Sequence, residues 1–337
     1  ILTRDHRMKG DRTLYLPGAD HAGFETQVVY EKHLAKAGKS RFDFNREELY
    51  QQVWDFVAKN RGNMELQMRE LGASADWSRF TFTLDDNIVK RAYATFKQLW
   101  DDSLIYRGER IVNFCTTHGT SFSDIEVEYK EEKSKIWEIS YLMVEEQRDI
   151  VVATTRPETI LGDVAIAVHP EDERYKHLIG KHASIPLIDK AIPIIADEMV
   201  DNEFGTGAVK ITPAHDPNDF EVGERHHLPN VTVINFDGTM SDEVPVKYQG
   251  MPVLKAREAV LSDLEAAGRL VSESDYTHSV GVCYKCKNPI QPLIKDQWFV
   301  RMKPLADKAA AAISDGKIKI IPASRVRSGL AYLENIK

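Results

Sequence analysis

Short runs of alternating apolar and polar residues fill the middle of the chain, and turn residues separate them. This is the pattern of half-buried β-strands. Strands are predicted at 136–144, 150–155, 165–168, 183–188, 191–196, 209–212 and 231–236. A helix is predicted at 254–267, and the residues expected on its buried face are Leu254, Val260, Leu261 and Leu264. The middle of the chain is therefore expected to form a compact, mostly β domain.

The two ends of the chain show helical spacing instead. Helices are predicted at 26–37, 46–71, 84–104 and 302–312, where apolar residues recur every three or four positions. Short strands are expected beside them at 13–16, 110–114 and 291–300. Because 337 residues exceed what one hydrophobic core usually holds, two or three domains of mixed α/β class are expected.

Composition changes this picture little. No run of apolar residues is long enough to cross a bilayer, and the first residues do not resemble a secretory signal, so a cytoplasmic protein is expected. The net charge of −8 argues against a surface covered with phosphate-binding residues. A local basic surface can coexist with an acidic total, so nucleic acid is neither required nor excluded as a partner.

Two pairs of metal-ligand residues lie far apart in the chain. Cys115 and His118 form one pair, Cys283 and Cys286 form the other, and two residues separate the members of each pair. Four such ligands suit a tetrahedral zinc ion, and four protein ligands leave no open position for catalysis, so a structural site is expected. The odd number of cysteines also favours a metal over a disulfide framework. The alternative is a free, buried Cys115 beside an incidental C-x-x-C.

The stretch 205–220 is the strongest candidate for a binding pocket. It reads as a glycine turn, a strand, and a loop that starts a helix with Asp216, Asn218 and Asp219 near its beginning. Two carboxylates beside unpaired backbone N–H groups can hold an ammonium or a hydroxyl of a ligand. The alternative is that Asp216 and Asn218 only cap a helix at 219–228.

Two further stretches place polar groups where strands end. The strand at 150–155 ends in two threonines followed by Arg156, where a scaffold strand would simply turn. Asp20 lies between a strand and a helix, the position at which α/β sheets place ligand-binding groups. The alternative for Asp20 is a capping residue in a turn.

These stretches resemble the class I aminoacyl-tRNA synthetases for valine, isoleucine and leucine. Three segments resemble the editing domain of that family: R-P-E-T at 156–159, G-D-V-A-I-A-V-H-P at 162–170 and G-A-V-K-I-T-P-A-H-D-P-N-D at 207–219. The combination is similar to the valyl members specifically. L-P-G-A-D-H-A-G at 16–23 resembles the valyl segment L-P-G-T-D-H-A-G, and Q-W-F-V at 297–300 fits the same members.

The resemblance implies an incomplete Rossmann-like catalytic domain, a zinc-ribbon neck and an inserted β-rich editing domain. The implied boundaries are 1–112 for the partial catalytic domain, 113–135 and 277–297 for the two halves of the neck, 136–276 for the editing domain and 298–337 for the return to the catalytic domain. The charged run 129–135 is expected to be a solvated hinge. Valyl synthetases that keep the zinc site usually have cysteine at the position of His118, so a Cys₃His site here rests on ligand chemistry.

The resemblance also assigns roles to residues. Asp20 would bind the ammonium of valine in the synthetic site. In the editing pocket Asp219 would hold the α-ammonium of a misplaced aminoacyl group, and Asp216 would accept the hydroxyl of threonine. The residues expected to contact the aminoacyl end or the terminal adenosine are Arg156, Lys210 and Thr212.

Members of this family join valine to tRNA with ATP and Mg²⁺. The chain lacks the H-I-G-H and K-M-S-K-S signatures with which class I synthetases bind ATP, so a fragment that retains only post-transfer editing is expected. A monomer is also expected. Its partners would be tRNA(Val) and aminoacyl-tRNA, with valine and threonine as the amino acids. Two alternatives are a non-catalytic tRNA-docking module and a fragment of an isoleucyl or leucyl synthetase. Lys210 and R-P-E-T argue against the latter.

Overall fold

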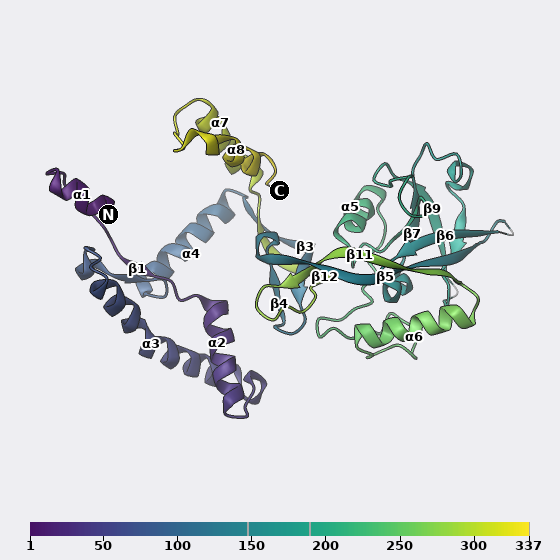
Figure 1. Cartoon of the computed structure of the whole chain (residues 1–337), viewed down its shortest axis with the longest axis horizontal. Helices are drawn as coiled ribbons and strands as arrows, with labels where there is room; N and C mark the ends of the chain where they lie inside the picture. The colour runs from purple at the N-terminus through teal and green to yellow at the C-terminus, as the bar shows by residue number, and fades with distance from the viewer. Residues whose placement is uncertain (147, 189, 337) are drawn as a thin grey trace. The chain divides into compact units, whose positions relative to one another are not determined.

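The computed structural model describes residues 1–146, 148–188 and 190–336 (Figure 1). The chain divides into two compact units, one of Ile1–Tyr106 with Val300–Lys337 and one of Arg107–Phe299. The final residue, Lys337, at which the predicted segment 298–337 ends, lies outside the described residues. None of the described helices is both long and apolar enough to cross a membrane.

The unit of Ile1–Tyr106 and Val300–Lys337 is mainly helical. Its helices are α1 (Leu2–Met8), α2 (Gly23–Lys36), α3 (Arg46–Glu70), α4 (Asp86–Asp101), α7 (Lys303–Ser314) and α8 (Val326–Glu334), with 3₁₀ turns η1 (Arg41–Asp43), η2 (Trp77–Arg79) and η6 (Ala323–Arg325). Helix α3 begins where the Asn45 side chain accepts a hydrogen bond from the Glu48 backbone N–H and the Glu48 carboxylate accepts one from the Asn45 backbone N–H. The four helices predicted from spacing are confirmed to within a few residues.

The strand predicted at 13–16 is wrong. The strand in this region is the two-residue β1 (Gly18–Ala19), which pairs in parallel with β2 (Thr81–Phe82). A strand needs a hydrogen-bonding neighbour, and β2 reaches only these two residues. Asp20 still lies directly between a strand and a helix, as expected.

The unit Arg107–Phe299 carries most of the β-structure. Its strands are β3 (Ile105–Cys115), β4 (Thr120–Phe122), β5 (Val127–Met143), β6 (Asp149–Thr154), β7 (Ala165–Val168), β8 (His182–Ser184), β9 (Ala191–Ala196), β10 (Ala208–Ile211), β11 (Leu270–Cys283) and β12 (Gln291–Val300). The helical segments are α5 (Pro217–His226), α6 (Val253–Ala266), η3 (Asp124–Glu126), η4 (Pro157–Gly162) and η5 (Lys176–Leu178).

One large sheet organises this unit. Its strand order is β10-β7-β9-β8-β5-β11, and β6 also pairs with β5. The pair β7 and β9 is parallel, whereas the other pairs are antiparallel. A smaller sheet has the order β12-β3-β4. In Figure 1 the long β5–β11 ribbon runs from the small sheet into the large one.

The core lies between the large sheet and α6. In the last part of β5, from 137 to 143, every second residue is buried, at Trp137, Ile139, Tyr141 and Met143. Helix α6 adds Val260 and Leu264 among its buried residues, and complete burial of each such side chain contributes about 1.5–3 kcal/mol. The inward orientation predicted for Leu254 is wrong, because 66% of that residue is exposed.

The charged run 129–135 is strand, and its prediction as a hinge is wrong. It lies within β5 and pairs with β11, with Lys135 opposite Asp275. The Lys135 ammonium contacts carboxylates of Glu273 at 2.9 Å and Asp275 at 3.1 Å. A two-stranded ribbon can be solvated on both faces, so it lacks the apolar alternation by which strands are recognised.

Two other strand predictions also need correction. The segment 231–236 is not a strand and contains a single bridge, Ile234 to Met240. Strand β8 ends at Ser184 rather than at Ile188. Both segments are apolar because they pack on the core as loops, and periodicity alone does not separate such loops from short strands.

Candidate functional site

A cavity of about 600 Å³ lies in the β-rich unit where β6, β10 and α5 meet the β5–β11 ribbon. The residues predicted for the editing pocket that line it are Arg156, Lys210, Thr212, Asp216 and Asp219. All five are thus brought together, although 63 positions of sequence separate the first from the last. The cavity is large enough for a ligand of drug-like size.

The strand β10 and the helix α5 deliver the two carboxylates. Gly205 and Gly207 have φ angles of 57° and 77°, so the predicted glycine turn uses the left-handed backbone that glycine favours. Asp216 is the N-cap of α5, where its Oδ1 accepts hydrogen bonds from the backbone N–H of Asn218 at 2.8 Å and of Asp219 at 3.2 Å. Capping occupies one carboxylate oxygen, which leaves Oδ2 for a ligand.

Asp219 is a buried acid on the cavity wall. Only 7% of the residue is exposed, and its Oδ2 accepts a hydrogen bond from the Thr212 backbone N–H at 2.8 Å. Burial raises the pKa of Asp219 to about 7; the Lys210 ammonium opposes the rise, and the Asp216 carboxylate adds to it. An ammonium entering the cavity would stabilise the ionised form of this carboxyl.

The positive charge of Lys210 is largely committed to another acid. Its ammonium lies 3.0 Å from Asp163 Oδ1 and donates to Thr212 Oγ1. Thr212 Oγ1 donates to the same Asp163 oxygen at 2.5 Å, and the Tyr141 hydroxyl donates to Asp163 Oδ2 at 2.6 Å. Asp163 is completely buried, which raises its pKa, while Lys210 opposes that rise. This network fixes Lys210 and Thr212 in place beside Asp219.

Arg156 is held by protein groups on three sides. It donates to the His215 carbonyl at 2.8 Å and to Gln291 Oε1 at 2.6 Å, and its Nε lies 3.5 Å from Glu158 Oε1. Glu158 is completely buried and accepts two hydrogen bonds from Arg257, at 2.8 and 2.9 Å. Arg156 therefore ties η4 to β12 and to the loop before α5, and 26% of its side chain remains exposed toward a ligand.

His215 lines the cavity but is unsuited to act as a base. Its Nε2 accepts a hydrogen bond from the Val233 backbone N–H at 2.8 Å. Burial lowers the pKa of His215 to about 3, and the charge of Arg156 adds to that effect. The ring is neutral at physiological pH, and the nitrogen that could take a proton is already occupied.

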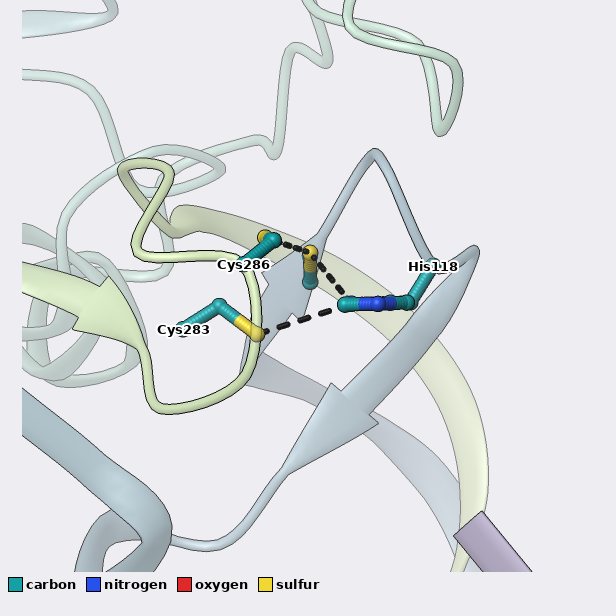
Figure 2. A group of neighbouring side chains, drawn as sticks. His118, Cys283 and Cys286 are labelled. Carbon is teal, nitrogen blue, oxygen red and sulfur yellow. Dashed lines mark hydrogen bonds between the residues drawn. The ribbon is translucent and has the colours of Figure 1, made fainter. Parts of the chain in front are cut away.

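The four metal-ligand candidates come together at the end of the β5–β11 ribbon. Cys115 ends β3, Cys283 ends β11, and His118 and Cys286 lie in the turns that follow (Figure 2). The Cys115 sulfur lies 3.4 Å from His118 Nδ1 and 3.6 Å from the Cys286 sulfur, and the Cys283 sulfur lies 3.5 Å from His118 Nδ1. The four ligand atoms all lie within 4.8 Å of one another.

These spacings fit a tetrahedral zinc ion. Bonds of about 2.3 Å to sulfur and 2.0–2.1 Å to nitrogen require ligand separations of roughly 3.5–3.8 Å along the edges of the tetrahedron. Burial raises the pKa of the Cys115 thiol to about 12, so a cation would have to be present for this sulfur to be a thiolate at neutral pH. The donor set suits a soft, four-coordinate divalent metal.

Comparison with known proteins decides the family. The family model described as tRNA synthetases class I (I, L, M and V) matches residues 1–337. The chain belongs to the class I tRNA synthetases. This confirms the family that the motifs predict.

The class I synthetase chain is similar to curated proteins named valine–tRNA ligase. The identity is 46% to the protein of Treponema denticola over 100% of the chain, and 49% to that of Streptomyces coelicolor over 99%. It is 47% to the protein of Legionella pneumophila over 100% of the chain. The chain spans 38%, 38% and 36% of the lengths of these three relatives. The predicted similarity to valyl members is confirmed.

Solved structures also match the synthetase chain. One of them is the ternary complex of LeuRS, tRNA and LeuAMS from Agrobacterium radiobacter K84. The match has a TM-score of 0.34 and 17% identity, and it covers 73% of this chain and 42% of that one.

Asp20 of the synthetase chain belongs to the helical unit, whereas the pocket residues belong to the β-rich unit. Its Oδ1 accepts a hydrogen bond from the Ala22 backbone N–H, and 71% of its side chain is exposed. Ala22 has a φ of 45° and a ψ of 59°, a left-handed conformation that turns the chain into α2. Asp20 thus closes the turn before α2 but does not cap the helix, whose N-cap is Ala22, and most of its side chain is open to a ligand.

Two residues that organise the synthetase pocket were not singled out from the sequence. Asp163 stands directly before the apolar run of β7, and a charged residue beside a buried strand needs a partner. That signal could have identified Asp163. Tyr141 carries no such signal, because a tyrosine in an alternating strand is ordinary core.

Proposed function

We propose that this chain hydrolyses the ester between threonine and the 3′ end of the valine tRNA, without ATP. The proposal rests on one observation above all: Asp219 and Asp216 lie side by side on the wall of a 600 Å³ cavity, and Asp219 is buried. The relatives named valine–tRNA ligase support valine tRNA as the RNA. A pocket shaped for valine rejects the isosteric threonine only about a hundredfold, which is why a valine–tRNA ligase needs a second, hydrolytic site.

In the proposed mechanism the two carboxylates bind different groups of the substrate. Ionised Asp219 holds the α-ammonium, and the free oxygen of Asp216 accepts the side-chain hydroxyl of threonine. These contacts place the ester carbonyl beside a water molecule. The water oxygen forms a bond to the carbonyl carbon, the bond to the ribose oxygen breaks, and that oxygen leaves with a proton from the water.

The other pocket residues position the substrate and stabilise the negative charge that develops during hydrolysis. Lys210 and Thr212 are fixed by Asp163, and the Lys210 ammonium would stabilise negative charge on the ester oxygen. The Thr212 hydroxyl already donates to Asp163, so Thr212 would act by positioning Lys210 and, through its backbone N–H, Asp219. Arg156 offers the exposed part of its guanidinium to the RNA end. Neither a metal ion nor a nucleophilic side chain is needed for this hydrolysis.

We also propose the domain roles that the family implies. Residues 1–112 and 298–337 would belong to the catalytic domain, 113–135 and 277–297 to a zinc-ribbon neck, and 136–276 to the editing domain. Zinc held by Cys115, His118, Cys283 and Cys286 would be structural. The full-length protein would join valine to its tRNA with ATP and Mg²⁺, with Asp20 binding the ammonium of valine. The chain would act as a monomer.

The test is deacylation of threonyl-tRNA(Val) by the purified chain in the absence of ATP. We expect release of threonine well above the uncatalysed rate, and slower release from valyl-tRNA(Val). A folded chain that binds the tRNA but leaves both esters intact would contradict the proposal and would favour a tRNA-docking module instead.

A further inference from the structure

The pocket residue Arg156 has a partner on a strand that carries none of the other predicted pocket residues. Its guanidinium donates to Oε1 of Gln291 at 2.6 Å, and Gln291 is the first residue of β12. Among the described residues that line the cavity, Arg156 is included and Gln291 is not. A contribution of Gln291 to ligand binding must therefore pass through Arg156.

The surroundings of Gln291 hold it in place. The backbone N–H of the preceding residue, Ile290, donates to the Gly281 carbonyl of β11 at 3.0 Å. Two positions further along β12, the side chain of Leu293 is buried in the core. Arginine has only donors, so the amide oxygen of Gln291 must face it. A fixed acceptor of this kind limits the orientations that the Arg156 guanidinium can adopt.

A buried carboxylate offers the Arg156 guanidinium a second place to turn. Its Nε atom lies 3.5 Å from Glu158 Oε1, which is longer than a normal hydrogen bond. Both oxygens of Glu158 already accept hydrogen bonds from Arg257, at 2.8 and 2.9 Å. Gln291 and the His215 carbonyl, at 2.6 and 2.8 Å, are closer partners of the guanidinium. Without Gln291 the guanidinium could turn toward buried Glu158, and less of it would face the cavity.

We infer that Gln291 is a positioning residue, which holds the Arg156 guanidinium in the orientation that a ligand in the cavity meets. The inference rests on the proposed function, in which Arg156 contacts the RNA end of the ester. Because Arg156 and Arg257 share the negative charge of Glu158, the positive charge of Arg156 is not fully compensated. Gln291 then sets where this charge is presented to an anionic group of the substrate.

Gln291 lies outside the segment 136–276, which is proposed as the editing domain. It belongs to the second half of the proposed neck, five positions after Cys286. With these boundaries, the orientation of a pocket side chain is set by a residue of the neck. The neck would therefore contribute to the pocket as well as connect it to the rest of the chain.

A purely structural role for the hydrogen bond between Gln291 and Arg156 predicts different behaviour. Its loss would lower the melting temperature and would leave KM unchanged at temperatures well below unfolding. A positioning role instead predicts weaker substrate binding by a chain that is still folded. It also predicts that this effect disappears when Arg156 is replaced, because the effects of two residues that act together are not additive.

The test compares Gln291→Ala, Gln291→Glu and Gln297→Ala in the full chain. Gln297 is the matched control, because it is the same residue type on the same strand and donates to Ser121 Oγ at 2.6 Å. With threonyl-tRNA(Val), Gln291→Ala should raise KM about 10-fold, as loss of a hydrogen bond to a charged group does, and should leave kcat nearly unchanged. Gln291→Glu keeps an acceptor for the guanidinium and should restore most of the affinity. Gln297→Ala should match the parent.

A double variant tests whether the effect passes through Arg156. The KM of Arg156→Ala with Gln291→Ala should equal that of Arg156→Ala alone. The Arg156→Ala change leaves Glu158 paired with Arg257, so its buried carboxylate keeps a cation. A parental KM in folded Gln291→Ala would overturn the inference, as would the same increase in KM with and without Arg156.

A second measurement needs neither hydrolysis nor RNA. Phenylglyoxal modifies accessible guanidinium groups, and mass spectrometry follows the rate at Arg156 with Arg174, whose side chain is 53% exposed, as the internal reference. Gln291→Ala should raise the rate at Arg156 about 3- to 10-fold, because one hydrogen bond no longer holds the group, and should leave Arg174 unchanged. An unchanged rate at Arg156 would overturn the inference. If the parent does not hydrolyse threonyl-tRNA(Val), the proposed function fails, and the modification rate still decides whether Gln291 positions Arg156.

Discussion

At the residue scale, the central feature is a buried acid with an incomplete set of partners. The Lys210 charge opposes the effect of burial on Asp219, but Asp163 already pairs with Lys210 at 3.0 Å, so the offset is only partial. A carboxyl in this position binds a proton at low pH and an ammonium when a substrate provides one. The pKa of Asp219 therefore links pH, stability and activity.

Activity should follow the ionisation of Asp219. The kcat/KM for threonyl-tRNA reports groups of the free enzyme, so it should rise with pH through about 7 and then level off. Asp219→Asn should lose this rise and should be slower by one to two orders of magnitude, because a charge-assisted contact contributes about 1.5–3 kcal/mol. An unchanged pH profile in Asp219→Asn would contradict the assignment.

The pH dependence of the free energy of unfolding should also report the ionisation of Asp219, and its direction follows from the pKa shift. The folded-state pKa of Asp219, about 7, lies above its ordinary value of 3.8, so the folded chain holds an extra proton between these pH values. The stabilisation is complete below pH 4 and is lost as the pH rises to about 7. Asp219→Asn should accordingly raise Tm more at pH 8 than at pH 4.

Asp163 should act as a positioning residue that also changes the pKa of Asp219. Its negative charge raises the pKa of Asp219, so Asp163→Asn should move the acidic limb of kcat/KM to lower pH. It should also destabilise the fold by about 3–5 kcal/mol, because Lys210 is left buried without its partner. Tyr141→Phe is the matched control, since it removes one hydrogen bond to Asp163 and keeps both charges. A limb that stays near pH 7 in Asp163→Asn would show a purely structural role.

The pocket itself could be predicted only in part from the sequence. Asp216 and Asp219 followed from a strand-to-helix pattern, but their roles came from the family resemblance. The Asp163 network was not predicted, because the hydrogen bonds that join Asp163 to Thr212 and Tyr141 connect segments distant in sequence. Sequence spacing reports neighbours along one element and not contacts between elements.

At the element scale, local pattern specifies a strand where one face is buried. Strands β7, β9 and β12 begin and end where apolar alternation and turn residues predict. The outer half of β5 was missed because both faces of the ribbon meet solvent and its pairing depends on charges such as Lys135 with Asp275. The outer half of β5 is a strand because it pairs with β11, and the local sequence pattern does not indicate that pairing.

Helix α6 offers a matched test of packing. Leu264 is completely buried in the core, whereas 66% of Leu254 on the same helix is exposed. Leu264→Ala should lower the free energy of unfolding by about 2–5 kcal/mol, because it leaves a cavity. Leu254→Ala should change it by less than about 0.5 kcal/mol. Chemical denaturation measures both, and equal effects of the two changes would contradict the packing of α6.

At the scale of the whole molecule, the metal cluster joins distant parts of the sequence. Cys115 and Cys286 are 171 positions apart, and the segment between them carries the entire pocket. Closing so long a loop costs chain entropy that a metal ion can offset. The ion would thereby stabilise the segment at its base without contacting the ester.

We expect about one zinc per chain, and a lower Tm after chelation. Cys283→Ser should lose the metal, whereas His118→Cys should keep it, because cysteine and histidine are both common zinc ligands. Metal analysis and thermal unfolding of the two variants check this. A metal-free chain that unfolds at the same temperature with and without chelator would refute the zinc site.

The most direct measurement compares two esters in Asp216→Ala and Asp219→Ala, each assayed well below its melting temperature. The esters are threonyl-tRNA(Val) and 2-aminobutyryl-tRNA(Val), which differ by the hydroxyl that Asp216 is proposed to accept. Asp219→Ala should slow both esters alike by one to two orders of magnitude, because both carry the ammonium. Asp216→Ala should slow the threonyl ester more than the 2-aminobutyryl ester. If folded Asp219→Ala hydrolyses threonyl-tRNA(Val) at the parental rate, this cavity is not the editing site.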